Sequence, residues 1–267
     1  MQLIRALPLL ALLIPTVAAA QDGVLCTVLT DANSAEILLQ EGSCDQPMSP
    51  ASTFKIAISL LGFDAGILTD EHSPALPFKE GYPDWGVNWK QTTDPAAWMS
   101  NSVLWYSQQV TQALGKERFA DYVTAFDYGN ADTSGDPGED NALTRAWLTS
   151  SLEISPIEQL AFLRAIVNRQ LPVSEHAYAM TGRITELTTL DSGWTIHGKT
   201  GSGYPRNADS RFDYAHGYGW FVGWASKGDR SIVFARQSQD SERQDTTAGV
   251  RSRDSLMAEL PALLGAL

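Results

Sequence analysis

The sequence is poor in metal-binding residues and in positive charge. Its 267 residues include two cysteines and four histidines, His72, His176, His197 and His216, and no two histidines have the H-x-x-x-H spacing of a zinc site. The 19 basic residues are outnumbered by 31 acidic ones, which gives a net charge of −12. We therefore expect neither a metal site nor binding to nucleic acid.

The sequence also lacks internal repeats and low-complexity tracts. After its first 20 residues, no apolar run reaches membrane-spanning length. No G-x-S-x-G motif occurs, which argues against an α/β-hydrolase. With 43% hydrophobic and 19% charged residues, the composition is that of a globular protein with a sizeable core.

The first 20 residues have the features of a secretory signal peptide. Arg5 supplies a positive start, residues 7–17 are apolar, and three alanines at 18–20 form a small-residue cleavage site. We therefore expect a mature chain that starts near Gln21, is exported to the periplasm and has no membrane contact after cleavage. Residues 21–267 are expected to form one domain, as a monomer or a homodimer.

Cys26 and Cys44 flank a predicted strand–turn–strand segment. Export places them in an oxidising compartment, where a cysteine pair usually forms a disulfide. A disulfide that staples this hairpin is the preferred interpretation, and two buried free thiols are the alternative. A catalytic cysteine is not expected, because neither residue starts a helix or is paired with a histidine.

Hydrophobic periodicity places strands at both ends of the chain and helices in the middle. The predicted strands are 24–29, 36–39, 194–199, 217–225 and 231–237, and the predicted helices are 52–63, 99–114, 117–126, 156–170, 175–187 and 252–264. We expect an α/β (α+β) fold, in which a mixed, mainly antiparallel sheet is flanked by helices. An all-helical subdomain would be inserted at about residues 65–190, with a small-molecule cleft at the junction.

The first chemical motif is Ser52-Thr53-Phe54-Lys55, at the start of an apolar predicted helix. Residues three apart share a helix face, and the helix N-terminus favours a developing anion. Desolvation favours the neutral lysine amine, which can serve as the base that a serine nucleophile needs. The alternative is an N-capping serine beside a lysine whose ammonium group reaches solvent.

The second motif is Lys199-Thr200-Gly201, at the end of a predicted strand. The glycine would let a substrate lie against the strand edge, and the two polar side chains could bind a carboxylate. S-x-x-K and K-T-G occur together in serine β-lactamases and penicillin-binding proteins. The S-D-N motif of class A enzymes is absent, and Tyr128-Gly129-Asn130 lies between the two motifs instead. Alone, Lys199-Thr200-Gly201 could be an ordinary strand-to-turn junction and Tyr128-Gly129-Asn130 a surface turn.

This combination resembles the class D (oxacillinase-type) serine β-lactamases. The resemblance runs from about Cys26 to the C-terminal helix and extends to Ser102-Val103-Leu104, Trp147-Leu148, Trp220-Phe221-Val222-Gly223-Trp224 and Arg251, just before the predicted last helix. Leu104 replaces the valine that is usual in the family. The resemblance implies the fold of serine β-lactamases and penicillin-binding proteins, and hydrolysis of β-lactam antibiotics that confers resistance.

The resemblance also implies the catalytic roles. Ser52 would be the nucleophile that becomes acylated, and Lys55 the general base. Ser102 would relay a proton to the lactam nitrogen, with Lys199 close by. The backbone N–H groups of Ser52 and Ser202 would form the oxyanion hole.

In this family the lysine base reacts with CO2 to form a carbamate, and no other cofactor is implied. An unprotonated Lys55 in apolar surroundings suits that reaction, and Leu104 and Trp147 would line those surroundings. The Trp147 indole N–H is a candidate donor to the buried anion. The alternative for Trp147 is a plain core aromatic.

Substrate binding would fall to the strand motif and to an arginine. Thr200, Gly201 and Arg251 would contact the substrate, because a planar guanidinium suits a carboxylate. Arg253 is a neighbouring rival for this role, and a surface charge at the helix start is the alternative for Arg251. Tyr128 and Asn130 would shape the cleft wall.

Two other classes of protein share these motifs. A penicillin-binding transpeptidase or carboxypeptidase would be acylated by β-lactams and stall. A β-lactam-sensing receptor domain would bind the antibiotic covalently without turnover, but transmembrane helices and an effector domain are expected beside it. The short sequence without an anchor favours the enzyme over both.

Overall fold

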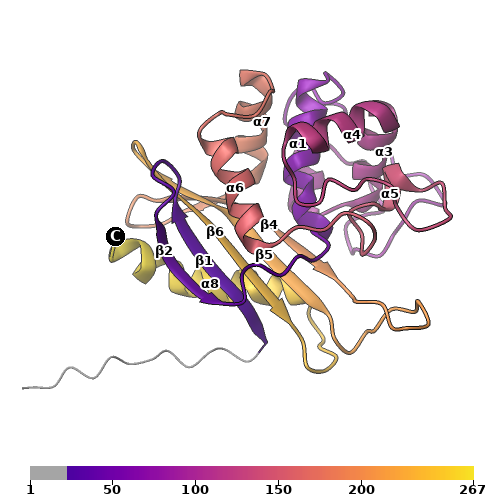
Figure 1. Ribbon diagram of the computed structural model, residues 1–267. Coiled ribbons are helices and arrows are strands. Elements are labelled where there is room, and N and C mark those ends of the chain that lie inside the picture. Colours follow the sequence, from indigo (N-terminus) through magenta and orange to yellow (C-terminus); the bar gives the residue numbers. More distant parts are fainter. Residues whose placement is uncertain (1–22) are drawn as a thin grey trace, which may run out of the picture.

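The computed structural model describes residues 23–267 and is built on a six-stranded antiparallel sheet (Figure 1). The strand order is β2-β1-β6-β5-β4-β3. The strands are β1 Val24–Asp31, β2 Ile37–Gly42, β3 Glu186–Thr189, β4 Thr195–Gly203, β5 Tyr218–Lys227 and β6 Arg230–Gln239. The proposed signal peptide at residues 1–20 lies outside the described residues.

Strands from the two ends of the chain meet in the middle of this sheet. β1 pairs antiparallel with β6, from Val24 opposite Ser238 to Asp31 opposite Ile232. β5 and β6 form a hairpin, and β4 pairs with β5 along its whole length. The predicted mainly antiparallel sheet, assembled from both termini, is therefore confirmed.

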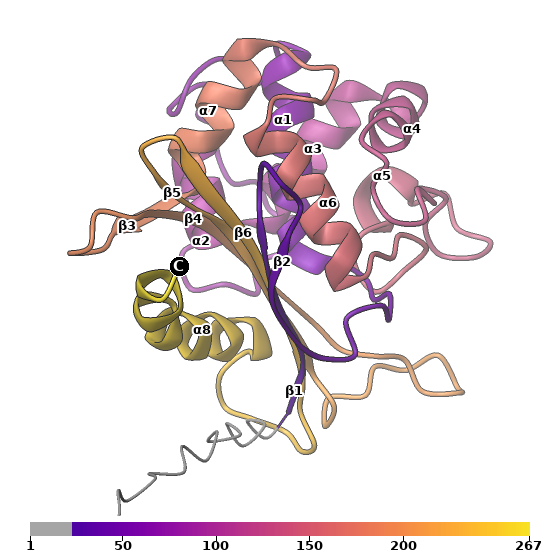
Figure 2. The same ribbon diagram turned by 60° about the vertical axis from the view of Figure 1, so that its left-hand side comes forward.

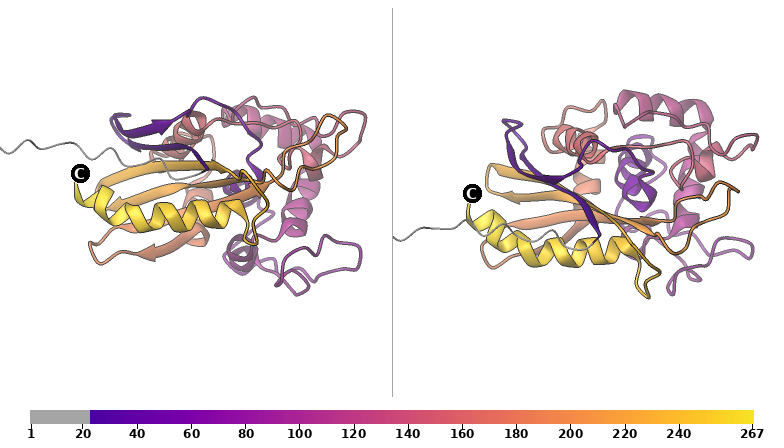
Figure 3. Two further views of the ribbon diagram at one scale, coloured as in Figure 1. Left: turned by 90° about the horizontal axis from the view of Figure 1, so that it is seen from below. Right: turned by 60° about the horizontal axis from the view of Figure 1, so that its bottom comes forward.

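Helices cover both faces of the sheet. They are the 3-10 helix η1 Ala51–Phe54, α1 Lys55–Asp64, α2 Pro95–Asn101, α3 Leu104–Leu114, α4 Lys116–Ala125, α5 Ala142–Arg145, α6 Pro156–Val167, α7 Glu175–Thr185 and α8 Ala248–Gly265. Figures 2 and 3 show α8 along one face and helices α1, α6 and α7 on the other. Helices α2 to α7 fall within 65–190, whose limits as a subdomain remain a prediction. No helix in residues 23–267 is long and apolar enough to cross a membrane.

Successive side chains along each strand point to opposite faces of the sheet, which divides the interior into two cores. On β6, Val233 and Ala235 point toward the helical side, whereas Ile232 and Phe234 pack against α8. Arg236 also lies on the α8 face, where it is buried and pairs with Glu259 of α8 at 2.5 Å. The helical side holds the larger core, so α1, the helix that carries Lys55, is surrounded by apolar groups.

The predicted disulfide between Cys26 and Cys44 is present. Cys26 lies on β1, and Cys44 follows β2, so the bond closes the N-terminal hairpin as expected. The alternative of two free thiols is therefore wrong.

Three boundaries differ from the sequence-based expectation. The single helix predicted at 99–114 is two helices, α2 and α3, separated at Ser102, which has a left-handed backbone (φ +56°). The Trp89 indole N–H donates to the Asn101 carbonyl at 2.9 Å, so a side chain occupies a carbonyl that a continuous helix would use. The end of the helix predicted at 175–187 is strand β3. The last helix starts at Ala248, so Arg251 lies in its first turn and not before it.

Candidate active site

Ser52 and Lys55 lie on consecutive helical segments. Ser52 is in the 3-10 helix η1, and Lys55 is the first residue of α1. The Lys55 Nζ donates to the Ser52 Oγ at 3.1 Å. The remaining residues of α1 as far as Phe63 are buried, so this helix presents its lysine within the core rather than to solvent.

Burial holds the pKa of the Lys55 amine well below its ordinary value of 10.5, and the nearby Lys199 ammonium lowers it further. Both influences oppose a positive charge on Lys55. The structure therefore favours the neutral amine, the form that can accept the Ser52 proton. The alternative of a lysine that reaches solvent is wrong, because Lys55 is fully buried.

Strand β4 brings the Lys199-Thr200-Gly201 motif against the Ser52 segment. A Cβ added at Gly201 would lie 2.6 Å from the Pro50 carbonyl oxygen and 3.1 Å from the Thr53 nitrogen, so glycine is required for this close approach. Among the described strands, β3 pairs with β4 at residues 195–197. From Lys199 to Gly203, β4 has β5 as its one strand neighbour, so its other edge is open beside Ser52.

Lys199 is almost completely buried on β4. Its Nζ donates to the Thr200 carbonyl at 3.1 Å and lies 3.4 Å from the Thr200 hydroxyl. Burial and, to a smaller extent, the nearby Arg253 cation together lower the pKa of Lys199 from 10.5 to about 7. Lys199 therefore changes charge near neutral pH.

Ser102 and Leu104 lie where α2 ends and α3 begins. The left-handed backbone of Ser102 ends α2, and Leu104 is the first residue of α3, with 3% of its side chain exposed. The Trp98 indole donates to the Ser107 hydroxyl at 2.8 Å, which ties the two helices together across this break. Ser102 is thus held at a sharp corner, not along a helix face.

Trp147 forms an aromatic wall behind the nucleophile segment. Its ring stacks on Phe54 with centroids 5.6 Å apart and meets the edge of Phe119 at 6.1 Å. The whole side chain is buried, and within residues 23–267 its indole nitrogen has no hydrogen-bond partner. A buried donor without a partner is rare in folded proteins. Trp147 is therefore part of the core and also carries an unused donor.

Tyr128 and Asn130 lie behind the nucleophile segment. Tyr128 is fully buried, burial raises the pKa of its phenol, and its hydroxyl accepts a hydrogen bond from Gln159 at 3.2 Å. Gln159 also donates to Thr53, so this glutamine, which the sequence analysis did not identify, links Tyr128 to the residue after Ser52. The Asn130 amide donates to the Ser151 carbonyl at 2.8 Å and supports the loop.

The two candidate arginines on α8 have different surroundings. Arg251 forms an ion pair with Asp240 and a hydrogen bond with the Thr246 carbonyl. Arg253 pairs with its neighbour Asp254 at 2.7 Å, and its charge acts on Lys199.

The start of α8 is attached to β4 beside these arginines. The Ser202 hydroxyl accepts a hydrogen bond from the Gly249 N–H at 2.9 Å. Ser202 follows the Lys199-Thr200-Gly201 motif directly. The helix start is therefore fixed to the residue whose own N–H is expected in the oxyanion hole.

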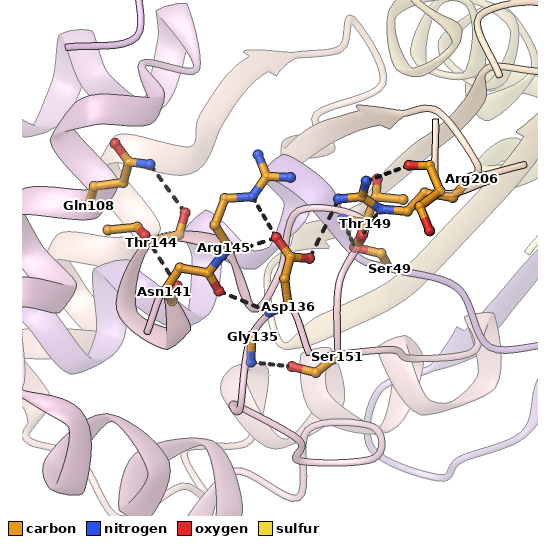
Figure 4. A network of polar contacts seen from close by, with 11 residues as sticks. Ser49, Gln108, Gly135, Asp136, Asn141, Thr144, Arg145, Thr149, Ser151 and Arg206 are labelled. Carbon is orange, nitrogen blue, oxygen red and sulfur yellow. Dashed lines mark hydrogen bonds and ion pairs between the residues drawn. The ribbon is translucent and has the colours of Figure 1, made fainter. Parts of the chain in front are cut away.

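A polar network lies at the outer edge of this region (Figure 4). The Asp136 carboxylate pairs with Arg145 of α5 and with Arg206, which follows β4, each at 3.5 Å. The Arg206 Nε also lies 3.5 Å from the Thr149 carbonyl oxygen. Loop 129–141 and the β4–β5 connection are thus joined through one carboxylate. In the described part of the chain no group of three or more His, Cys, Asp or Glu residues could hold a metal ion.

Comparisons with known proteins agree with this geometry. Residues 25–261 match the family model "Penicillin binding protein transpeptidase domain". The chain is 43% identical over 241 residues to β-lactamase OXA-9 of Klebsiella pneumoniae, which covers 90% of this chain and 88% of the relative. It is 38% identical over 242 residues to β-lactamase OXA-1 of Escherichia coli. That alignment covers 89% of this chain and 84% of the relative.

The solved structures give the same result. The crystal structure of OXA-427, a class D β-lactamase, superposes with a TM-score of 0.86 at 47% identity and covers 90% of this chain and 98% of that one. The family match spans most of the chain, and two curated relatives exceed 30% identity over most of their length. A serine–lysine pair at the N-terminus of a buried helix, beside the open edge of a K-T-G strand, is the arrangement expected of such an enzyme. The chain therefore belongs to the class D serine β-lactamases, within the penicillin-binding-protein transpeptidase family.

Proposed function

We propose that this enzyme hydrolyses the lactam amide of β-lactam antibiotics through an ester on Ser52. The 3.1 Å contact between the Ser52 hydroxyl and the buried Lys55 amine carries the proposal, because burial favours the uncharged amine, which can act as a base. Lys55 takes the hydroxyl proton, the Ser52 oxygen attacks the lactam carbonyl carbon, and the C–N bond breaks. Water then attacks the ester, which releases the opened product and restores Ser52.

The remaining residues are assigned from the motifs that the chain shares with the class D enzymes. The N–H groups of Ser52 and Ser202 stabilise the carbonyl oxygen as it becomes negative, and losing one such donor typically costs about 3 kcal/mol. Ser102, at the corner between α2 and α3, delivers a proton to the lactam nitrogen with the help of Lys199. Thr200 and Arg251 bind the substrate carboxylate, and the Gly201 edge of β4 lies along the substrate. Tyr128 and Asn130 support the cleft wall.

We further propose that Lys55 is carboxylated by CO2. The fit is supported by the neutral state of the amine and by the Trp147 indole donor, which has no partner elsewhere in residues 23–267. The carbamate would supply an anionic oxygen as the base in place of the amine nitrogen. Trp147 would donate to it, and Leu104 would restrict the access of water.

Carboxylation is expected to be reversible, because a carbamate loses CO2 when its amine becomes protonated. Degassing at mildly acidic pH should lower the activity, and bicarbonate should restore it without new protein. Carbon-13 NMR with labelled bicarbonate should show a carbamate signal that is absent in Lys55→Ala. In Trp147→Ala the signal should need more bicarbonate. Full activity without CO2, and no such signal, would identify Lys55 as a plain amine base.

We also propose that the protein is exported to the periplasm. The N-terminal signal features and the Cys26–Cys44 disulfide, which suits an oxidising compartment, support this. The intact mass of protein recovered from the periplasm should correspond to a chain that starts at Gln21. A full-length chain retained in the cytoplasm would contradict export.

Turnover of nitrocefin, a chromogenic cephalosporin, tests the main proposal and separates it from the two rivals. The purified enzyme should complete many turnovers per Ser52, whereas a transpeptidase or a receptor domain would show one burst. Mass spectrometry with a slow β-lactam should show the adduct on the Ser52 peptide, and Ser52→Ala should abolish both. Turnover that persists in Ser52→Ala would refute the assignment.

A further inference from the structure

One buried hydroxyl joins the nucleophile segment to the turn that carries Trp147. The Ser49 Oγ donates to the Trp147 carbonyl at 2.8 Å. It also accepts a hydrogen bond from the Thr149 N–H at 2.8 Å, and Figure 4 shows Ser49 beside Thr149. Ser49 is 4% exposed, and its two partners are about a hundred residues away along the chain. A single side chain thus satisfies a backbone acceptor and a backbone donor of the same turn.

The turn itself depends on outside support. Thr149 has a left-handed backbone (φ +52°), a strained conformation for a β-branched residue that persists where the surroundings impose it. Its hydroxyl lies 2.9 Å from the Tyr218 hydroxyl of β5. Ser49 therefore acts at the point where the backbone would most readily relax.

The Ser49 side of the contact is equally fixed. The Trp220 indole of β5 donates to the Ser49 carbonyl at 3.1 Å. The next carbonyl, that of Pro50, accepts from both the N–H and the hydroxyl of Thr53, at 3.1 and 2.8 Å. Ser49 is thus anchored to the sheet and to the same turn that positions Ser52.

We propose that Ser49 is a positioning residue for the reaction. It holds the Trp147 ring in its place against the Ser52–Lys55 segment. This rests on the proposed role of Lys55 as the base. Trp147 stacks on Phe54, the residue before Lys55, so a shift of the Trp147 turn opens the apolar pocket of the lysine. Without the hydroxyl, the Trp147 carbonyl and the Thr149 N–H lose their shared partner, and water becomes the replacement.

The chain offers a matched control in Ser59. This serine is also fully buried, lies on α1 with Lys55, and bonds the Thr181 hydroxyl of α7 at 2.9 Å. Ser59→Ala removes a buried hydroxyl from α1, the helix that carries Lys55, and leaves the Trp147 turn unchanged. Ser49→Thr keeps a hydroxyl and serves as the rescue variant.

The experiment compares Ser49→Ala, Ser49→Thr and Ser59→Ala with the parent enzyme. Carbon-13 NMR of lysine Cε, in CO2-free buffer, follows the titration of Lys55, whose signal is assigned by its loss in Lys55→Met. Lys199 is the charged neighbour acting on Lys55, and it is retained in all variants. We expect the Lys55 titration to rise by about one pH unit in Ser49→Ala, as water enters, and to stay at the parent value in the other two.

Kinetics give the second readout. With nitrocefin, kcat of Ser49→Ala should fall about tenfold with KM nearly unchanged, because the base is displaced and not the binding edge. Should Ser49→Ala not fold, Ser49→Cys, with a weak thiol donor, replaces it with the same expected direction.

Titration of Lys55 that is equal in Ser49→Ala and Ser59→Ala, with both variants merely less stable, would overturn the proposal. A parent enzyme that does not turn over nitrocefin would instead refute the proposed function. The NMR comparison would still decide the role of Ser49.

Discussion

At the scale of single residues, two buried lysines and one arginine form a series of interacting cations. Lys199 disfavours the charge on Lys55, and Arg253 disfavours the charge on Lys199. A lysine with a pKa of about 7 in the folded protein and 10.5 when unfolded binds fewer protons in the folded state between those values. The Lys199 contribution to the free energy of unfolding therefore rises with pH from about 7 to 10.5, and its penalty is largest below pH 7.

The same lysine predicts a pH profile. If charged Lys199 attracts the substrate carboxylate, kcat/KM for the free enzyme should fall as pH rises through about 7. Arg253→Gln removes a cation that lowers the pKa of Lys199, so the fall should move to higher pH. The measurement is kcat/KM against pH for both proteins. If the fall in kcat/KM lies at the same pH in both proteins, the profile does not report the charge of Lys199.

Arg251 gives a second residue-scale prediction. As the proposed carboxylate ligand, Arg251→Ala should lower kcat/KM by about ten- to a hundredfold, because a hydrogen bond to a charged group contributes about 1.5–3 kcal/mol. Arg253→Ala is the control for loss of a positive charge on the same helix, compared well below pH 7, where Lys199 is charged with or without Arg253. Unchanged kinetics in Arg251→Ala, with Arg253→Ala impaired, would transfer the role to Arg253.

At the scale of elements, the contact between α8 and β4 is set by glycine. A Cβ on Gly249 would lie 2.2 Å from the Gly201 carbonyl oxygen and 2.7 Å from the Ser202 hydroxyl. Because the backbone at this contact cannot move by itself, α8 would have to shift away from β4, the strand that we propose to form part of the oxyanion hole. A one-methyl change in this helix therefore bears directly on Ser202.

Gly249→Ala should destabilise the protein by about 1–3 kcal/mol and lower kcat. Denaturant unfolding and nitrocefin kinetics measure the two effects. Gly265→Ala, at the other end of α8, has no atom within 4 Å of the added Cβ and is the control. Normal kcat in a destabilised Gly249→Ala would mean that the α8 start does not control the oxyanion hole.

Most elements could be predicted from periodicity because their apolar faces are regular. α1 and β5 are apolar almost throughout, and the structure buries both. The break at Ser102 could not be predicted locally, since it depends on the Trp89 indole, which approaches from a distant loop. The motif residues Ser52 and Lys199 are visible in the sequence. Ser49 and Gln159 are not, because their importance lies in contacts about a hundred residues away.

At the scale of the whole molecule, the sheet is held to α8 by a buried cation. Arg236 of β6 donates to Thr27 of β1 at 2.9 Å and to Ser255 and Glu259 of α8. Arg236→Met should lower the free energy of unfolding by about 3 kcal/mol, because it breaks a largely buried ion pair. It should leave kcat at low temperature unchanged, since the side chain lies on the α8 face and the Ser52–Lys55 pair lies on the other. Calorimetry and kinetics check this; reduced kcat in fully folded protein would show coupling across the sheet.

The pairing of β1 with β6 has a consequence for synthesis. β1 and the nucleophile Ser52 emerge from the ribosome early, yet β6 begins at Arg230, near the end of the chain. No N-terminal fragment can therefore complete the sheet, and the Lys199 strand has no inner neighbour until β5 has been made. For most of translation the nascent chain therefore carries Ser52 without strand β4 beside it. The sheet can therefore close only after β6 has been made, so the chain lacks its complete fold until late in synthesis, which would suit the export that we propose.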